Sequence, residues 1–179
     1  MLKTFARVTG RINDLVGYVT AHLVLVMFVL LFCEVLFRYL WRQPTVWTGE
    51  LSQMLFGVYA LLGGGYLLAR GGHVNVDIVY GAFPPRVKAS IDVFTSILFF
   101  LFVAVLLWQG LSLASDSIAR WERSHSAWNP PIWPVKLAIP LAALLILLQG
   151  LVKLASDILV ALGHEPVAAG DAEAPGDQL

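Results

Sequence analysis

Four long hydrophobic runs, separated by shorter polar stretches, dominate the pattern of the chain. A helix needs about 20 apolar residues to cross roughly 30 Å of hydrocarbon. Each run meets this length, and we predict spans near residues 17–40, 48–69, 91–112 and 140–162. Because backbone groups in lipid must be satisfied within their own segment, these spans should be helices. The predicted fold is an all-α integral membrane protein with one four-helix membrane domain, residues 1–162.

The segments between the runs predict how the helices connect. Residues 41–47 form a short connection that contains Pro44, so spans one and two should form an antiparallel hairpin. The second connection, residues 70–90, contains the polar stretch RGGHVNVD. Two consecutive prolines follow it and should stop any helix that begins after Asp77.

Beyond spans three and four the pattern becomes amphipathic and then polar. Apolar residues continue past span three at three- and four-residue spacing, with charged residues on other faces: Trp108, Leu111, Ala114, Ile118 and Trp121. This spacing predicts an amphipathic interfacial segment. Prolines end that segment, and Pro140 should kink the entrance to span four. Residues 163–179 are acidic and rich in Ala, Gly and Pro, which predicts a disordered cytoplasmic tail.

Composition supports the membrane interpretation and excludes several other classes. The chain is 58% hydrophobic and 13% charged, against about a quarter charged in soluble domains. The net charge is zero and no basic patch is present, so nucleic acid is not an expected partner. Cys33 is the single cysteine, which excludes an intrachain disulfide and a thiol zinc cluster. The first run is too long for a signal peptide and lacks a cleavage site, so we expect it to be retained.

Two features bear on orientation. An N-terminus inside the cell puts six Lys and Arg residues in the cytoplasm and five outside, which favours that orientation by a small margin. All six tryptophans fall at the end that carries the first and third connections: Trp41, Trp47, Trp108, Trp121, Trp128 and Trp133. They could form an interfacial belt or a docking surface for a partner outside the membrane.

Three sets of residues are candidates for structural or partner-contact roles. Glu34 and Arg38 are four apart in span one, with the acid first, which suits a helical ion pair better than a proton site. Glu50 lies in the first turn of span two after Thr48, a candidate N-cap, where the helix dipole favours a carboxylate. Small residues within a narrow arc of span two predict a helix-packing seam: Gly57, Ala60 and Gly64.

The histidines do not predict a cofactor site. A membrane haem needs two histidines at similar depth on facing helices, and only His22 lies within a span. His73 and Asp77 are four apart, but two ligands without a third do not make a zinc site. No serine or cysteine nucleophile has a convincing base nearby. We therefore predict no cofactor, no tightly bound metal and no enzymatic activity.

The order of these features resembles a known family. FCEVLFRY lies in span one, WTGE opens span two, a glycine-rich span runs into RGGHVNVD, and PPIWPVKLAIP opens span four. This order is similar to that of the small membrane subunit of tripartite ATP-independent periplasmic (TRAP) transporters, the DctQ-type small permease. The similarity covers nearly the whole chain apart from the tail.

The resemblance implies a small subunit of the bacterial inner membrane with both termini cytoplasmic. It implies a large M-type permease that carries substrate and sodium, and a periplasmic binding protein that delivers an organic acid or similar solute. The family pattern corresponds to these positions: Glu34, Arg38, Trp47, Glu50, Arg70, His73, Asp77, Pro131, Trp133 and Pro140. On this interpretation the chain is a scaffold that binds and stabilises the large permease.

The stretch RGGHVNVD is then interpreted as a structural corner. Arg70 would be a cationic stop at the cytoplasmic end of span two, and the two glycines would let the chain turn. The polar residues that follow alternate with valines, which suits a segment at the interface with one side against membrane lipid or a partner. A membrane anchor or assembly subunit of another complex stays open, and a b-type cytochrome is a weaker alternative. A small exporter would need an acid near mid-membrane, and Glu34 is too close to the end of its span.

Overall fold

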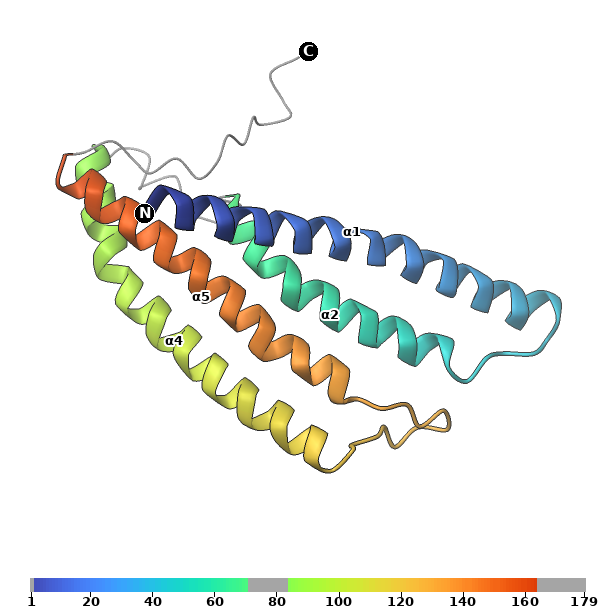
Figure 1. The fold of residues 1–179 in the computed structure, drawn as a ribbon. Helices are drawn as coiled ribbons and strands as arrows, with labels where there is room; N and C mark the ends of the chain where they lie inside the picture. The colour runs from blue at the N-terminus through green and yellow to red at the C-terminus, as the bar shows by residue number, and fades with distance from the viewer. Residues whose placement is uncertain (1, 71–83, 164–179) are drawn as a thin grey trace, which may run out of the picture.

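The computed structural model describes residues 2–70 and 84–163 (Figure 1). These residues form four helices: α1 (Leu2–Leu40), α2 (Thr48–Ala69), α4 (Pro85–Ala119) and α5 (Trp133–Ala161). All four are long and apolar enough to cross a membrane. Within the described residues the β-structure is limited to an isolated bridge between Arg123 and Pro131. The predicted all-α membrane fold is confirmed.

Helix α5 is the centre of the structure. In Figure 1 the helices lie side by side in the order α1, α2, α5 and α4, and α5 packs against all three of the others. In the most hydrophobic stretch of each helix, 44% of the α5 residues are buried, against 6% to 11% in the other helices. The apolar outer faces of α1 and α4 are therefore left without a partner inside the described chain.

Three helices, α1, α4 and α5, begin before their predicted spans, whereas α2 has the predicted bounds. Helix α1 begins at Leu2 rather than near residue 17, because its first turns bury one face against the rest of the protein. Ala6, Thr9 and Asn13 lie on that face and are buried. The predicted amphipathic segment after span three forms the last two turns of α4, so its helix runs on without interruption.

A buried polar contact joins α1 to α5. The side-chain amide of Asn13 has no exposed surface, and its Nδ2 donates to the Thr9 carbonyl oxygen at 3.2 Å and to Gln149 Oε1 at 3.3 Å. Gln149 is also buried, on the facing side of α5. Hydrogen bonds between helices stabilise membrane proteins by about 0.6 kcal/mol on average. This contact fixes the position of α1 against α5.

Glycines allow close approach where α1 crosses α2 and where α4 crosses α5. A Cβ built on Gly17 of α1 would lie 2.8 Å from the Tyr66 Cβ of α2, and one on Gly65 would lie 2.5 Å from Asn13 Oδ1. A Cβ on Gly110 of α4 would lie 3.2 Å from the Pro140 nitrogen of α5. Backbones can come this close only where no side chain stands between them.

Pro140 lies inside α5 rather than at its entrance, and it is buried against Gly110 of α4. Its nitrogen carries no hydrogen to donate to the preceding turn. Residues 71–83 lie outside the described residues, and they include the predicted corner after Arg70, with His73 and Asp77. Residues 164–179 of the predicted tail also lie outside the described residues.

Candidate functional site

Charged residues mark the two ends of the helix layer. We call the end with the α1–α2 and α4–α5 connections the loop end, and the opposite end, where α1 begins, the terminal end (Figure 1). Each helix has an interval without Asp, Glu, Lys or Arg, bounded by these residues: Asp14 and Glu34, Glu50 and Arg70, Asp92 and Asp116, Lys136 and Lys153. At 1.5 Å per residue these intervals span about 26 to 36 Å. They match the thickness of a hydrocarbon core of about 30 Å.

Glu34 is the centre of a polar cluster at the loop end. Its residue surface is 8% exposed, and its Oε1 accepts a hydrogen bond from Arg38 Nη2 at 2.5 Å. The other oxygen, Oε2, accepts from the Thr45 backbone N–H at 3.0 Å and from the Thr45 hydroxyl. Both carboxylate oxygens are therefore engaged by donors that favour the ionised form. This geometry favours a structural role, in which Glu34 ties the α1–α2 connection to α1.

The predicted N-cap of α2 is wrong by one residue. Thr48 is the first residue of the helix, and Trp47 occupies the N-cap position without a side-chain capping bond. The Thr48 hydroxyl instead pairs with the Thr45 hydroxyl, so the connection satisfies it. The N-terminus of α2 is thus linked through Thr45 to Glu34.

Glu50 and Trp47 join the two connections at the loop end. The Ser126 hydroxyl, in the α4–α5 connection, donates to Glu50 Oε2 at 2.5 Å. The rings of Trp47 and Trp128 lie 6.3 Å apart between their centroids. Aromatic pairs at this distance stabilise a contact by about 0.5 to 1.5 kcal/mol beyond area burial. Glu50 lies in the first turn of α2, as predicted, and it also binds the neighbouring connection.

A second ion pair closes the α4–α5 connection. Lys136 Nζ lies 2.5 Å from Glu122 Oε2, and the Ile132 N–H donates to the Glu122 carbonyl oxygen at 3.1 Å. The hydrogen bond from Lys136 lowers the pKa of the Glu122 carboxyl. The rings of Trp121 and Trp133 pack edge to face at 6.2 Å beside this contact. Trp133 therefore belongs to the packing between helix ends, whereas Pro131 forms the bridge with Arg123.

Ion pairs also join helices at the terminal end. Arg70 Nη2 lies 3.2 Å from Asp14 Oδ1, and its guanidinium lies over the Tyr66 ring at 5.2 Å. Lys153 of α5 pairs with Asp92 of α4 at 2.7 Å and with Asp157 of α5 at 2.9 Å. Arg70 is thus placed as a contact between α1 and α2, in addition to its predicted position at the end of α2.

The small residues of α2 divide between two environments. A Cβ on Gly57 would lie 3.8 Å from Val135 Cγ1, and one on Gly64 would lie 3.3 Å from Ile146 Cδ1, so both face α5. Ala60 is exposed. The close contact also includes Gly65, which faces Asn13 and Leu145 and lay outside the predicted seam.

Several contacts could not be expected from spacing alone. The partners Asn13 and Gln149, or Glu50 and Ser126, are far apart in the sequence and meet only through the fold. Lys153 and Asp157 did carry a signal, because they are four apart inside predicted span four. In the described residues no group of three or more His, Cys, Asp and Glu side chains could hold a metal ion.

Comparisons with known proteins match this chain to a transporter family. A family model for the DctQ component of tripartite ATP-independent periplasmic transporters matches residues 5–160. The sialic acid TRAP transporter permease protein SiaT of Haemophilus influenzae is 24% identical over 106 residues, which cover 59% of this chain and 17% of that protein. The sialic acid TRAP transporter small permease protein SiaQ of Vibrio cholerae is 26% identical over 80 residues, covering 45% of this chain and 46% of that protein.

The match to the family extends over all four helices, whereas the matched part spans less than half of either relative. Members of this family are transporter subunits and not enzymes. Four apolar helices and the family match make this chain a multi-pass membrane protein. The chain belongs to the DctQ family, the small permease component of TRAP transporters.

Proposed function

We propose that this chain is a scaffold that binds and stabilises the large permease in sodium-coupled, binding-protein-dependent uptake of an organic acid or similar solute. The large permease would carry substrate and sodium, and a periplasmic protein would deliver the substrate. The relatives named for sialic acid transport support an acidic solute. The proposal assigns this chain to the bacterial inner membrane, with both termini cytoplasmic and the loop end periplasmic.

The interior of the described helices supports a scaffold rather than a carrier. A carrier of a polar solute needs desolvated polar groups or broken helices near the middle of the membrane. In the described residues the four helices are continuous, and each has a central interval without charged side chains. Thr20, a buried hydroxyl of α1, donates to backbone carbonyls of its own helix. The described chain thus offers no polar path across the hydrocarbon.

His22 is the observation that carries the proposal of a protein partner. It lies on an exposed face of α1, about 12 Å beyond the level of Asp14 toward the loop end. Its Nδ1 lies 2.7 Å from the Tyr18 carbonyl oxygen, which can only accept, so Nδ1 carries the hydrogen. In the neutral ring Nε2 is then an acceptor, and no hydrogen bond joins it to a described residue. A donor from another membrane helix would satisfy it at a depth where water is absent.

The residues around His22 form a face suited to helix packing. Tyr18 precedes His22 by one helical turn, Leu25 and Phe32 follow it at helical spacing, and all three are more than half exposed. A largely apolar stripe that carries the His22 ring at membrane depth fits a transmembrane helix that presents a hydrogen-bond donor. A lipid tail could cover the apolar side chains but would leave Nε2 unsatisfied. The large permease is the partner that the family assigns to a small permease.

Co-purification from membranes tests this proposal. The tagged chain, produced with the large permease of its own transporter, should retain that permease in mild detergent at a fixed ratio. His22→Leu should weaken the association about 3- to 20-fold, because one interhelical hydrogen bond contributes about 0.6 to 1.7 kcal/mol. His22→Gln, which keeps a polar group, is the matched control. Failure of the wild-type chain to retain the large permease would contradict the proposal and favour an anchor of another complex.

A further inference from the structure

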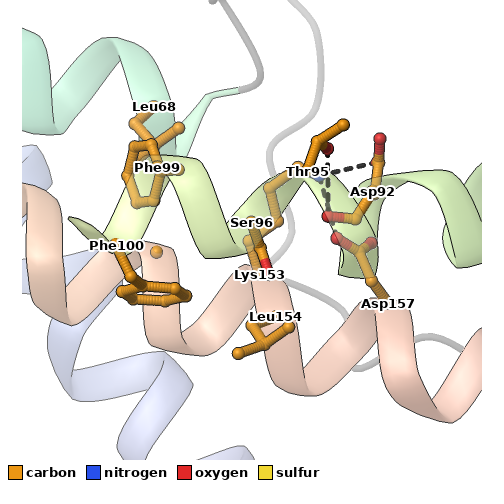
Figure 2. A pocket seen from close by; sticks show the side chains of 10 residues that line it. Leu68, Asp92, Thr95, Ser96, Phe99, Phe100, Lys153, Leu154 and Asp157 are labelled. Atoms are coloured by element: carbon orange, nitrogen blue, oxygen red, sulfur yellow. Dashed lines mark hydrogen bonds and ion pairs between the residues drawn. The ribbon is translucent and has the colours of Figure 1, made fainter. Parts of the chain in front are cut away.

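A cavity opens between α4 and α5 near the terminal end, with Leu68 of α2 at its side (Figure 2). Its volume is about 190 Å³, room for roughly six water molecules of about 30 Å³ each. Asp92, Thr95, Lys153 and Asp157 line its polar part, and Phe99 and Phe100 line its apolar part. Thr95 and Lys153 are exposed, so a ligand can reach the cavity from the surface of the protein.

The cavity wall changes from charged to apolar along the helices. On α4 it passes from Asp92 through Thr95 and Ser96 to Phe99 and Phe100, a rise of about 12 Å. The antiparallel α5 changes over the same levels, from Asp157 through Lys153 to Gly150. Figure 2 shows Phe99 and Phe100 at one end of the group and Asp92 and Asp157 at the other. A ligand aligned with the membrane normal would thus need a polar end and an apolar end.

The charged end of the cavity offers both signs of charge. Lys153 Nζ lies 2.7 Å from Asp92 Oδ2 and 2.9 Å from Asp157 Oδ2. A phosphate could accept hydrogen bonds from Lys153, while a primary ammonium could donate to Asp157. A purely anionic headgroup would instead meet two carboxylates around a single ammonium. A trimethylated amine has no N–H to donate to a carboxylate.

The level of the cavity matches the boundary of the membrane. Asp92 and Lys153 are the residues at which the charge-free intervals of α4 and α5 end at the terminal end. Arg70 and Asp14 pair at the same end of the layer. The charged part of the cavity therefore coincides with the headgroup region, and Phe99 and Phe100 lie at the depth of acyl chains.

We propose that this cavity binds one phospholipid with a zwitterionic phosphoethanolamine headgroup. Its phosphate lies at Lys153, its ammonium lies at Asp157, and its acyl chains pass Phe99, Phe100 and Leu68 toward the membrane centre. Gly150 leaves room for the Phe99 ring, because a Cβ there would lie 2.5 Å from Phe99 Cε1. The site does not depend on which protein binds the exposed face of α1.

Competition among lipids tests the proposal on the unaltered full chain. The purified chain is equilibrated in mixed micelles with equal amounts of phosphatidylethanolamine, phosphatidylcholine and phosphatidylglycerol that share the same acyl chains. Native mass spectrometry then reports the lipid that stays bound. We expect one phosphatidylethanolamine per chain, preferred about tenfold or more, because its ammonium donates charge-assisted hydrogen bonds to Asp157 that a trimethylated amine cannot make. Equal retention of the three lipids, or preference for phosphatidylglycerol, would overturn the proposal.

Variants locate the bound lipid. Asp157→Asn and Lys153→Met should each reduce phosphatidylethanolamine retention about tenfold. Asp14→Asn is the matched control, because it breaks an ion pair at the same end without touching the cavity. Gly150→Ala should lower retention through Phe99 without changing any charge. Retention in Asp157→Asn equal to that in Asp14→Asn would show that the lipid binds elsewhere and would also overturn the proposal.

Discussion

Substitution of Gly17 by alanine should force α1 and α2 apart. The Cβ of an alanine at this position would lie 2.4 Å from Tyr66 Cγ and Cδ2 and 2.8 Å from Tyr66 Cβ. Carbon atoms in favourable contact are about 3.5 to 4.0 Å apart. The ring of Tyr66 could rotate, but its Cβ is fixed to the backbone of α2. The two helices would therefore have to separate by about 1 Å.

Gly10 provides the matched control on the same helix. Apart from its chain neighbours and its own helix backbone, a Cβ at Gly10 would meet no described atom within 4 Å. Both substitutions gain the helix propensity of alanine over glycine, about 1 kcal/mol, so that gain cancels in the comparison. Overpacking costs about 1 to 3 kcal/mol, and Gly17→Ala should be less stable than Gly10→Ala by this amount.

Equilibrium unfolding in mixed detergent micelles, followed by tryptophan fluorescence, measures the difference. A double-mutant cycle with Tyr66→Gly then isolates the contact, because the cost of Gly17→Ala should disappear once the ring and the Cβ of residue 66 are both removed. Equal unfolding free energies for Gly17→Ala and Gly10→Ala would refute the close approach of α1 and α2.

Three further predictions follow from the contacts described above. The Lys136 hydrogen bond lowers the pKa of Glu122 below its ordinary value of 4.5, so the pair should stabilise the chain above pH 4.5 and less as the pH falls through the lowered pKa. The thermal unfolding temperatures of wild type and Glu122→Gln should therefore converge in acid. A difference that stays constant with pH would contradict this. Gly64→Leu should separate α2 from α5 at Ile146 and reduce both co-purification of the large permease and uptake. Gly63→Leu is the control and should have a smaller effect, because a Cβ there meets no described atom within 4 Å apart from its chain neighbours and its own helix backbone. Equal losses in the two variants would argue against the packing seam. After Cys33→Ala, cysteines introduced at Pro44 and Trp128 should react with an impermeant reagent in intact cells and one at Gly170 only after permeabilisation; external labelling at Gly170 would reverse the proposed orientation.

The spanning helices could be predicted because their signal is local. Length and apolar character are properties of each run, and the structure has four helices over these runs. The first turns of α1 were missed because Thr9 and Asn13 are polar, and their burial depends on α5 rather than on lipid. Helix ends that pack on protein do not carry the hydropathy signal of a membrane span.

The side-chain contacts were predictable only where both partners lie on one helix. The pair of Glu34 and Arg38 follows from four-residue spacing, and it forms in the structure. The bonds from Thr45 to Glu34 and from Ser126 to Glu50 depend on how the two connections fold. The small residues of α2 showed that a close contact was possible, but which of them faces α5 depends on the rotation of the helix.

Uptake into vesicles reconstituted from defined components tests the scaffold account most directly. Vesicles that contain this chain and the large permease, with the binding protein outside and an inward sodium gradient, should accumulate an organic acid. Omission of this chain should abolish accumulation, and this chain without the large permease should accumulate none. Accumulation by this chain alone, or undiminished uptake in its absence, would contradict the account.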